Sequence, residues 1–292
     1  MPSLDDLKKR IKSVKSTQKI TKAMKMVAAA KLRKAQENAE KGRPYSQKMQ
    51  NIILNLTKSM NDPQNAPKLL IGTGKDKIYL CVVLTADRGL CGGFNSNICK
   101  LAKTNFKKIL SEGKELKIIT VGTKGLDQIR REYGKYVIKK FSFKNKKQIT
   151  FNEAEIIGKE IINLFIQNQF DKCILFYNNF KNVITQIPQA QQIIPAENSS
   201  SKNKEENLTS YEFEPEEDEI LEDLIPKNIS TQVFKAFLEN AASEQGSRMT
   251  AMDNATRNAG ELVDKLTINY NRSRQASITK ELIEIISGAE SL

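Results

Sequence analysis

The sequence contains no histidine and no tryptophan, and its 292 residues include only four cysteines. Without histidine, Ser-His and Cys-His nucleophiles, histidine metal ligands and histidine acid–base catalysis are all excluded. The cysteines form no C-x-x-C pair, so a zinc site would need all four thiolates from scattered positions: Cys81, Cys91, Cys99 and Cys173. We therefore expect reduced, structural cysteines and a protein with no cofactor.

Long apolar runs are also missing from the chain. No segment approaches the roughly 20 consecutive apolar residues that span a bilayer. The first 20 residues lack the apolar core of a signal peptide, and the early acids Asp5 and Asp6 are not typical of a transit peptide. With 39% hydrophobic and 28% charged residues, the composition predicts a soluble protein that stays where it is made.

Positive charge is in excess, and it is unevenly distributed. The net charge is +13; residues 1–48 hold 14 Lys and Arg against four acids, whereas residues 197–223 hold 11 acids against two lysines. Five lysines near the N-terminus recur every three or four residues, which places them in one stripe on a helix: Lys8, Lys12, Lys15, Lys19 and Lys22. No aromatic residue precedes Tyr45 to stack on single-stranded nucleic acid. A solvated face, a docking surface for acidic protein loops and a nucleic-acid site all remain open.

Both ends of the chain are predicted to form long helices. Apolar residues at steps of mostly three and four predict a helix over 3–58, and Pro44 predicts a kink or a break in it. A second, proline-free stripe near the C-terminus contains Met249, Met252, Ala255, Ala259, Leu262, Leu266, Asn269, Ser273 and Ala276. A helix of about 60 residues is ~90 Å long, and so thin a seam is typical of a coiled coil. We expect the two helices to pair antiparallel.

The middle of the chain alternates between strands and helices. Strands are predicted over 77–85, 116–122, 136–143, 172–178 and 183–194, the last at an edge because of Pro188; helices are predicted over 95–111, 125–133 and 151–169. This alternation predicts a mostly parallel α/β sheet. Residues 196–219 are polar and acidic and predict a loop. The domains expected are an N-terminal coiled-coil helix (1–60), an α/β head (61–225) and a C-terminal coiled-coil helix (226–292).

A glycine-containing segment, "LTADRGLCGGFNSN" (84–97), raises the possibility of a phosphate site. It matches neither G-x-x-x-x-G-K-[ST] nor G-x-G-x-x-G, the patterns that converge backbone N–H groups on an anion. A nucleotide-binding enzyme that uses Gly89–Gly93 is thus a weaker hypothesis. We expect that Gly92 and Gly93 permit close backbone approach and that Asn95 or Ser96 caps the next helix.

Three segments together resemble the gamma subunit of the bacterial-type F-type ATP synthase, in the right order over nearly the whole chain: "IKSVKSTQKITKAMKMVAAAKLRKAQ" (11–36), "LTADRGLCGGFN" (84–95) and "NRSRQASITKELIEIISGA" (271–289). The resemblance implies an α/β fold with a Rossmann-like head and an antiparallel coiled coil of the terminal helices. It also implies a non-catalytic central-stalk rotor, which transmits torque between the membrane rotor ring and the catalytic ring. A basic coiled-coil protein that binds nucleic acid is the alternative.

The same resemblance implies partners and contact residues. The partners are the alpha and beta subunits, the epsilon subunit and the membrane c-ring, without nucleic acid, on the cytoplasmic face of the bacterial inner membrane. Arg274 and Gln275 correspond to a pair that hydrogen-bonds loops of the ring, and Thr279 and Glu281 lie beside it. Two further contact residues are Met24, which faces an acidic helix–turn–helix of the beta subunits, and Arg248 at the same level.

Overall fold

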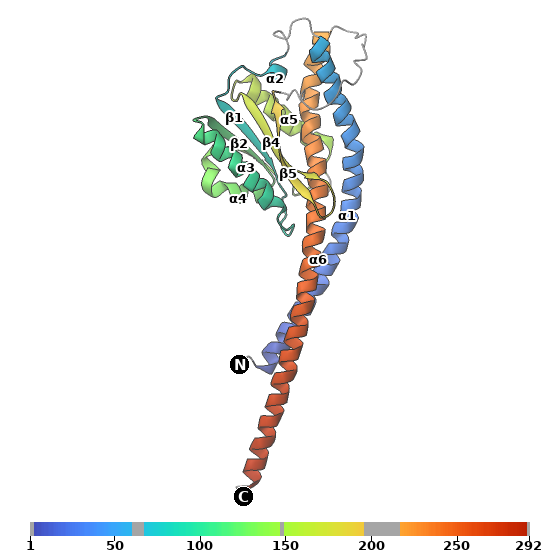
Figure 1. The fold of residues 1–292 in the computed structure, drawn as a ribbon, viewed down its shortest axis with the longest axis vertical. Helices are drawn as coiled ribbons and strands as arrows, with labels where there is room; N and C mark the ends of the chain where they lie inside the picture. The colour runs from blue at the N-terminus through green and yellow to red at the C-terminus, as the bar shows by residue number, and fades with distance from the viewer. Residues whose placement is uncertain (1–2, 60–66, 147–148, 196–216, 291–292) are drawn as a thin grey trace. The chain divides into compact units, whose positions relative to one another are not determined.

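The computed structural model describes residues 3–59, 67–146, 149–195 and 217–290 of the chain (Figure 1). The chain divides into two compact units, one formed by Met1–Ala30 with Arg248–Leu292 and the other by Lys31–Ser247. Two long helices contribute residues to both units: α1, Leu4–Ser59, and α6, Glu217–Glu290. Each unit is described below by itself.

The larger unit contains a five-stranded sheet with the strand order β3-β2-β1-β4-β5. Neighbouring strands are parallel from β3 to β4, and β5 runs antiparallel to β4. The strands are β1 (Ile78–Leu84), β2 (Glu115–Val121), β3 (Val137–Phe141), β4 (Lys172–Phe180) and β5 (Gln186–Ile194). The strand order reverses between β1 and β4, the point at which doubly wound α/β sheets bind their ligands.

Helices cover both faces of this sheet (Figure 1). One face packs against α3 (Phe94–Ser111) and α4 (Thr123–Tyr133). The other packs against α2 (Lys68–Ile71), α5 (Phe151–Ile166) and parts of α1 and α6. Because neither face of β1 meets water, its sequence is apolar at nearly every position instead of alternating.

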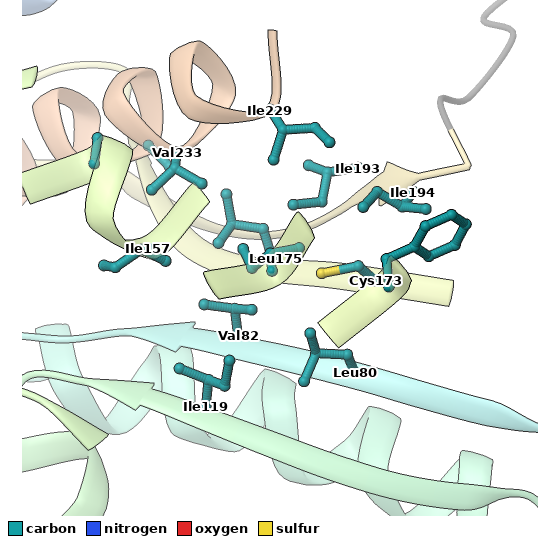
Figure 2. Close-up of a cluster of buried hydrophobic side chains, with 14 of the residues drawn as sticks. Leu80, Val82, Ile119, Ile157, Cys173, Leu175, Ile193, Ile194, Ile229 and Val233 are labelled. Atoms are coloured by element: carbon teal, nitrogen blue, oxygen red, sulfur yellow. The ribbon is translucent and has the colours of Figure 1, made fainter. Parts of the chain in front are cut away.

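The side chains of β1 divide between two core clusters. Cys81 and Val83 point to the α3 side, whereas Leu80 and Val82 point to the α5 and α6 side. Figure 2 shows the second cluster, in which Val233 of α6 lies over the strands. Burial of each large aliphatic side chain contributes roughly 1.5–3 kcal/mol, so this cluster is the main source of the affinity of α6 for the sheet.

In the smaller unit α1 and α6 form an antiparallel coiled coil. Lys25 lies opposite Asp253, and Thr21 lies opposite Thr256. Most buried and half-buried positions follow alternating steps of four and three residues: Leu7, Ile11, Val14, Gln18, Thr21, Lys25 and Ala28 of α1, and Met252, Thr256, Ala259, Val263, Leu266, Tyr270, Ser273 and Ser277 of α6. This spacing is a heptad pattern. The predicted fold class is confirmed.

The predicted seam is correct at some positions and wrong at others. Leu262 is 44% exposed and Val263 takes its place, while Ile20 and Val27 of α1 are exposed beside Thr21. A small residue beside the seam allows the helices to approach closely: a Cβ added to Gly260, next to Ala259, would lie 3.0 Å from Nε2 of Gln18. A prediction from hydrophobicity alone therefore placed Leu262 in the seam instead of the adjacent Val263.

A break at Pro44, one of the two alternatives predicted there, and the predicted start of the C-terminal helix at 226 are both wrong. Helix α1 continues through Pro44 without a break, because its packed face is on other positions and the proline is exposed. Helix α6 begins at Glu217, so three residues of the predicted acidic loop are helical; acidic residues are favourable in a first helical turn. The rest of that loop, 196–216, lies outside the described residues. The domain limits at 60/61 and 225/226 stay predictions.

Candidate functional site

The predicted lysine stripe lies on the surface of α1. All five lysines are exposed: Lys8, Lys12, Lys15, Lys19 and Lys22. Each lies next to a seam position such as Leu7, Ile11 or Val14, so the stripe runs beside the buried seam. The coiled coil thus holds the charged groups in a row, and it leaves them exposed to solvent.

Met24 and Arg248 are both half-buried, within the unit formed by the ends of the chain. Next to Met24, the Lys25 ammonium lies 2.7 Å from a carboxylate oxygen of Asp253, and its hydrogen bond lowers the pKa of that carboxyl. Ile20 and Val27 are exposed by 57% and 56% on the same stretch of α1. Met24 therefore belongs to a stretch where apolar and cationic side chains reach the surface together.

The C-terminal end of α6 has no partner helix among the described residues. The seam ends at Ser277 of α6, because α1 begins at Leu4, and every side chain over 278–287 is exposed. The large apolar side chains of this end are between 49% and 67% exposed: Ile278, Leu282, Ile283, Ile285 and Ile286. Contiguous exposed apolar residues of this kind mark an interaction surface.

The remaining predicted contact residues lie on this end of α6. Arg274, Gln275, Thr279 and Glu281 are all exposed. The Thr279 hydroxyl donates to the carbonyl oxygen of Gln275 at 2.9 Å, so it satisfies a backbone acceptor and its side chain is held against the helix. The Gln275 side-chain amide makes no hydrogen bond to the residues that the structure describes, and it is exposed on α6.

The glycine loop is shaped by contacts of its own. Gly92 has a φ of +56° and Leu90 a φ of +61°. Asn95, which lies inside α3 and is 6% exposed, accepts from the Ala86 N–H at 2.9 Å and donates to the Cys91 sulfur at 3.2 Å. Gly93, not Asn95 or Ser96, occupies the position before α3. The expected cap is wrong because the Asn95 side chain folds the loop instead.

At the point where the strand order reverses, polar side chains of α6 take the place that a ligand would occupy. Asn240 donates to the carbonyl of Leu84 at 3.0 Å and accepts from the N–H of Asn178 at 2.9 Å. The Ser243 hydroxyl donates to the carbonyl of Asn178 at 3.3 Å. Asn178, Asn240 and Ser243 are buried. This arrangement supports the interpretation of Gly89–Gly93 as a structural loop.

Asp87, in the same glycine-loop motif, ties the ends of the neighbouring strands together. Its carboxylate accepts from the N–H groups of Thr123 and Phe143, both at 3.0 Å, and from the Ser142 hydroxyl at 2.8 Å. Thr85 adds a hydroxyl that donates to the carbonyl of Val121 at 3.0 Å. The "TAD" part of the motif therefore has a structural role.

The ionisable groups do not converge on a catalytic or metal centre in the described part of the chain. No group of three or more Cys, Asp or Glu residues there could hold a metal ion. All four cysteines are buried, and burial raises the pKa of the Cys99 thiol to about 11. Among the same residues, no helix combines the length and the hydropathy needed to cross a membrane.

Sequence reasoning missed one prominent constellation, an ion pair between the half-buried Arg43 of α1 and the buried Glu239 of α6. Glu239 is 2% exposed, and Nε of Arg43 lies 2.6 Å from its carboxylate. The only local signal was that both residues fall on helix faces otherwise filled by small or apolar side chains. Their pairing across 196 residues could not be read from spacing.

Comparisons with known proteins give a consistent result over the whole chain. A family model described as ATP synthase matches residues 3–292. The chain is 71% identical to the ATP synthase gamma chain of Pelagibacter ubique and 58% identical to that of Rhizobium leguminosarum, in both cases over 100% of each chain. These curated relatives are bacterial.

Solved structures agree with the fold. The structure matches a chain in the central stalk and c-ring of Tetrahymena thermophila mitochondrial ATP synthase, with a TM-score of 0.59, 28% identity and coverage of 81% of this chain and 99% of that one. It also matches a chain in an OSCP/F1/c-ring structure of Euglena gracilis mitochondrial ATP synthase, with a TM-score of 0.69, 21% identity and coverage of 99% and 94%.

Proposed function

This chain belongs to the ATP synthase family, and from that membership and its full-length likeness to gamma chains we propose that it is the central-stalk rotor subunit of a proton-translocating F-type ATP synthase. In this role it is a non-catalytic subunit that carries torque between a membrane rotor ring and a catalytic ring. The comparisons lend no support to the alternative, a coiled-coil protein that binds nucleic acid.

The observation that carries the proposal is the unpaired end of α6. The exposed side chains of Ile278, Leu282 and Ile285 mark an interaction surface, which supports a partner that surrounds this end of α6. We assign the ring of alpha and beta subunits to this end, with Arg274 and Gln275 as hydrogen-bonding residues and Thr279 and Glu281 beside them. The epsilon subunit and the c-ring are the proposed partners of the α/β head.

The lysine stripe and Met24 are the proposed contacts with acidic elements of the ring. Exposed charge pairs contribute little energy each, but a continuous row of five lysines steers and aligns an acidic partner. Met24, half-buried beside this stripe, supplies an apolar contact at the same level, and Arg248 adds a cation.

The proposed mechanism follows from asymmetry. Two helices have no threefold symmetry, so they present a different surface to each of three otherwise equivalent catalytic sites. A rotor that contacted every conformation equally would shift no equilibrium, whereas unequal contact favours a different conformation at each site. Rotation then moves these preferences from site to site, at the cytoplasmic face of the bacterial inner membrane in our proposal.

Purification through a tag on this chain from a membrane preparation tests the proposal. We expect recovery of alpha and beta subunits near three each per copy of this chain, together with ATPase activity. Recovery of the chain alone, or with nucleic acid that dissociates in high salt, would contradict it.

A further inference from the structure

The hydrogen-bond ladder between β1 and β4 ends before β4 does. The two strands pair from Tyr79 opposite Lys172 to Val83 opposite Phe176, and β4 continues to Phe180. Beyond that pair, side chains of α6 replace the backbone of β1. This part of α6 belongs to the same compact unit as the sheet.

Asn240 and Glu239, adjacent on α6, bind the end of β4. The Asn178 N–H donates to Oδ1 of Asn240 at 2.9 Å, and the Phe180 N–H donates to Oε2 of Glu239 at 3.0 Å. Through Nδ2, Asn240 also donates to the carbonyl of Leu84 at the end of β1. One helix therefore continues the sheet at the point where two strands separate.

Arg43 connects α1 to the same end of β4. Its Nε and one terminal nitrogen donate to the two oxygens of Glu239 at 2.6 and 3.0 Å, and that terminal nitrogen also donates to the carbonyl of Phe180 at 2.9 Å. Both backbone groups of Phe180 are thus bound by a single ion pair. Because Glu239 is 2% exposed, water screens its carboxylate only weakly, whereas the Arg43 side chain is 37% exposed.

These bonds restrict rotation of α6 about its own axis, a motion that apolar packing restricts only weakly. Apolar burial, here by Ile229, Val233 and Phe237 of α6, is non-directional and mainly opposes separation of the helix from the sheet. Hydrogen bonds weaken steeply when their angles change. Rotation of α6 about its own axis would misalign the bonds of Asn240 and Glu239 at once, whereas part of the apolar contact would persist.

We propose that Arg43, Glu239 and Asn240 are positioning residues that lock α1 and α6 against rotation relative to the sheet, so that torque passes between the α/β head and the helices. We call these three residues, with the backbone of Phe180, the torsion lock. The inference rests on the proposed rotor function. It adds the position at which the α/β head is fixed to the two helices against rotation. Directional bonds of this kind resist a twisting load on α1 and α6 more strongly than apolar packing alone.

The test uses the complete ATP synthase in membrane vesicles, with the double variant Arg43→Met/Glu239→Met. Both charges are removed together, because removal of one would leave an unpaired buried charge and destabilise the fold. ATP hydrolysis and proton pumping are measured per assembled complex as the opposing proton gradient rises. We expect hydrolysis within twofold of the wild type, and pumping per ATP at least threefold lower against the highest gradient.

The control double variant is Lys103→Met/Glu132→Met, which removes a 2.6 Å ion pair between α3 and α4. It should pump at the wild-type ratio at every gradient. A second test variant, Asn240→Leu, keeps the Arg43–Glu239 pair and the same number of side-chain heavy atoms, and should give an intermediate loss.

Wild-type pumping per ATP in both test variants at every gradient would overturn the torsion lock. So would a lower yield of complexes that each pump at the wild-type ratio, because that result describes a purely structural role. Failure of the proposed function is a separate outcome: the wild-type chain itself would then not co-assemble with a proton-pumping ATPase.

Discussion

The hydroxyl oxygens of Thr21 and Thr256 lie 2.7 Å apart, across the seam between the two terminal helices. A polar pair at a seam position helps to fix the register of the two helices but buries little apolar surface. With Gln18 and Lys25 as neighbouring seam residues, this part of the coiled coil is weakly apolar. Its stability therefore depends on a few residues.

The seam register leads to a first prediction. Val263→Ala should destabilise the terminal helix pair by about 1–2 kcal/mol, because it removes buried methyl groups. Leu262→Ala, one position earlier, should change stability by less than about 0.5 kcal/mol, because Leu262 is 44% exposed. Thermal unfolding of the isolated chain followed by circular dichroism measures both. Equal losses in the two variants would mean that the seam lies elsewhere.

A second prediction compares alanine substitutions at two glycines, Gly122 and Gly89. A Cβ added to Gly122, whose φ is +93°, would lie 2.2 Å from the carbonyl oxygen of Thr85, whereas one added to Gly89 would meet nothing within 4 Å. Gly122→Ala should lower the free energy of unfolding by about 2 kcal/mol or more. Gly89→Ala should be nearly neutral in urea unfolding. A large loss for Gly89→Ala instead would show that this glycine has a role that its surroundings do not reveal.

The stabilisation of the N-terminal end of α5 depends on pH. Glu153 accepts from the N–H and the hydroxyl of Thr150 at 2.8 and 2.6 Å, and these bonds lower the pKa of its carboxyl to about 2. The folded pKa lies below the unfolded one, so this stabilisation is complete above pH ~4.5 and is lost as the pH falls toward 2.

Glu153→Ala should therefore cost about 1 kcal/mol at pH 7, as expected for loss of a helix cap, and the deficit should shrink toward zero near pH 2. The control is Glu155→Ala, which removes only an exposed pair with Lys159 and should cost less than about 0.5 kcal/mol at any pH. Urea unfolding at a series of pH values measures the difference. A deficit that stayed constant with pH would exclude the charged carboxylate as its cause.

Gln275→Leu should impair coupled ATP turnover of the complex while assembly survives, because a directional contact with the ring is lost and the exposed helix remains. Turnover per purified complex is the measurement. Asn269→Leu is the control, since it removes a similar amide from another exposed face of α6. Normal turnover in Gln275→Leu would refute the role proposed for Gln275.

Met24→Lys should reduce protons pumped per ATP hydrolysed, because it adds a charge at a half-buried apolar contact. Met26→Lys adds the same charge one turn beyond Lys22, where it merely extends the exposed lysine stripe. We expect a clear loss of coupling in the first variant and little in the second. Indistinguishable pumping ratios would remove Met24 from the proposed contact surface.

Local patterns predicted the elements of the α/β sheet well, since strands such as β1 are uniformly apolar and Pro188 lies on the edge strand β5 as expected. They could not choose between Leu262 and Val263, because both fit a period near 3.5 residues and the partner helix decides. Nor could they predict the torsion lock, in which Arg43 and Glu239 meet only after the chain has folded.

The burial of the four thiols has a practical consequence. Cys81, Cys91, Cys99 and Cys173 are at most 2% exposed, and a thiol held away from water in its protonated form reacts slowly with alkylating reagents. A cysteine introduced at an exposed position such as Ile138, 44% exposed on β3, would react far faster. The unaltered chain is thus already a suitable background for a single optical probe, whose turning could be watched directly.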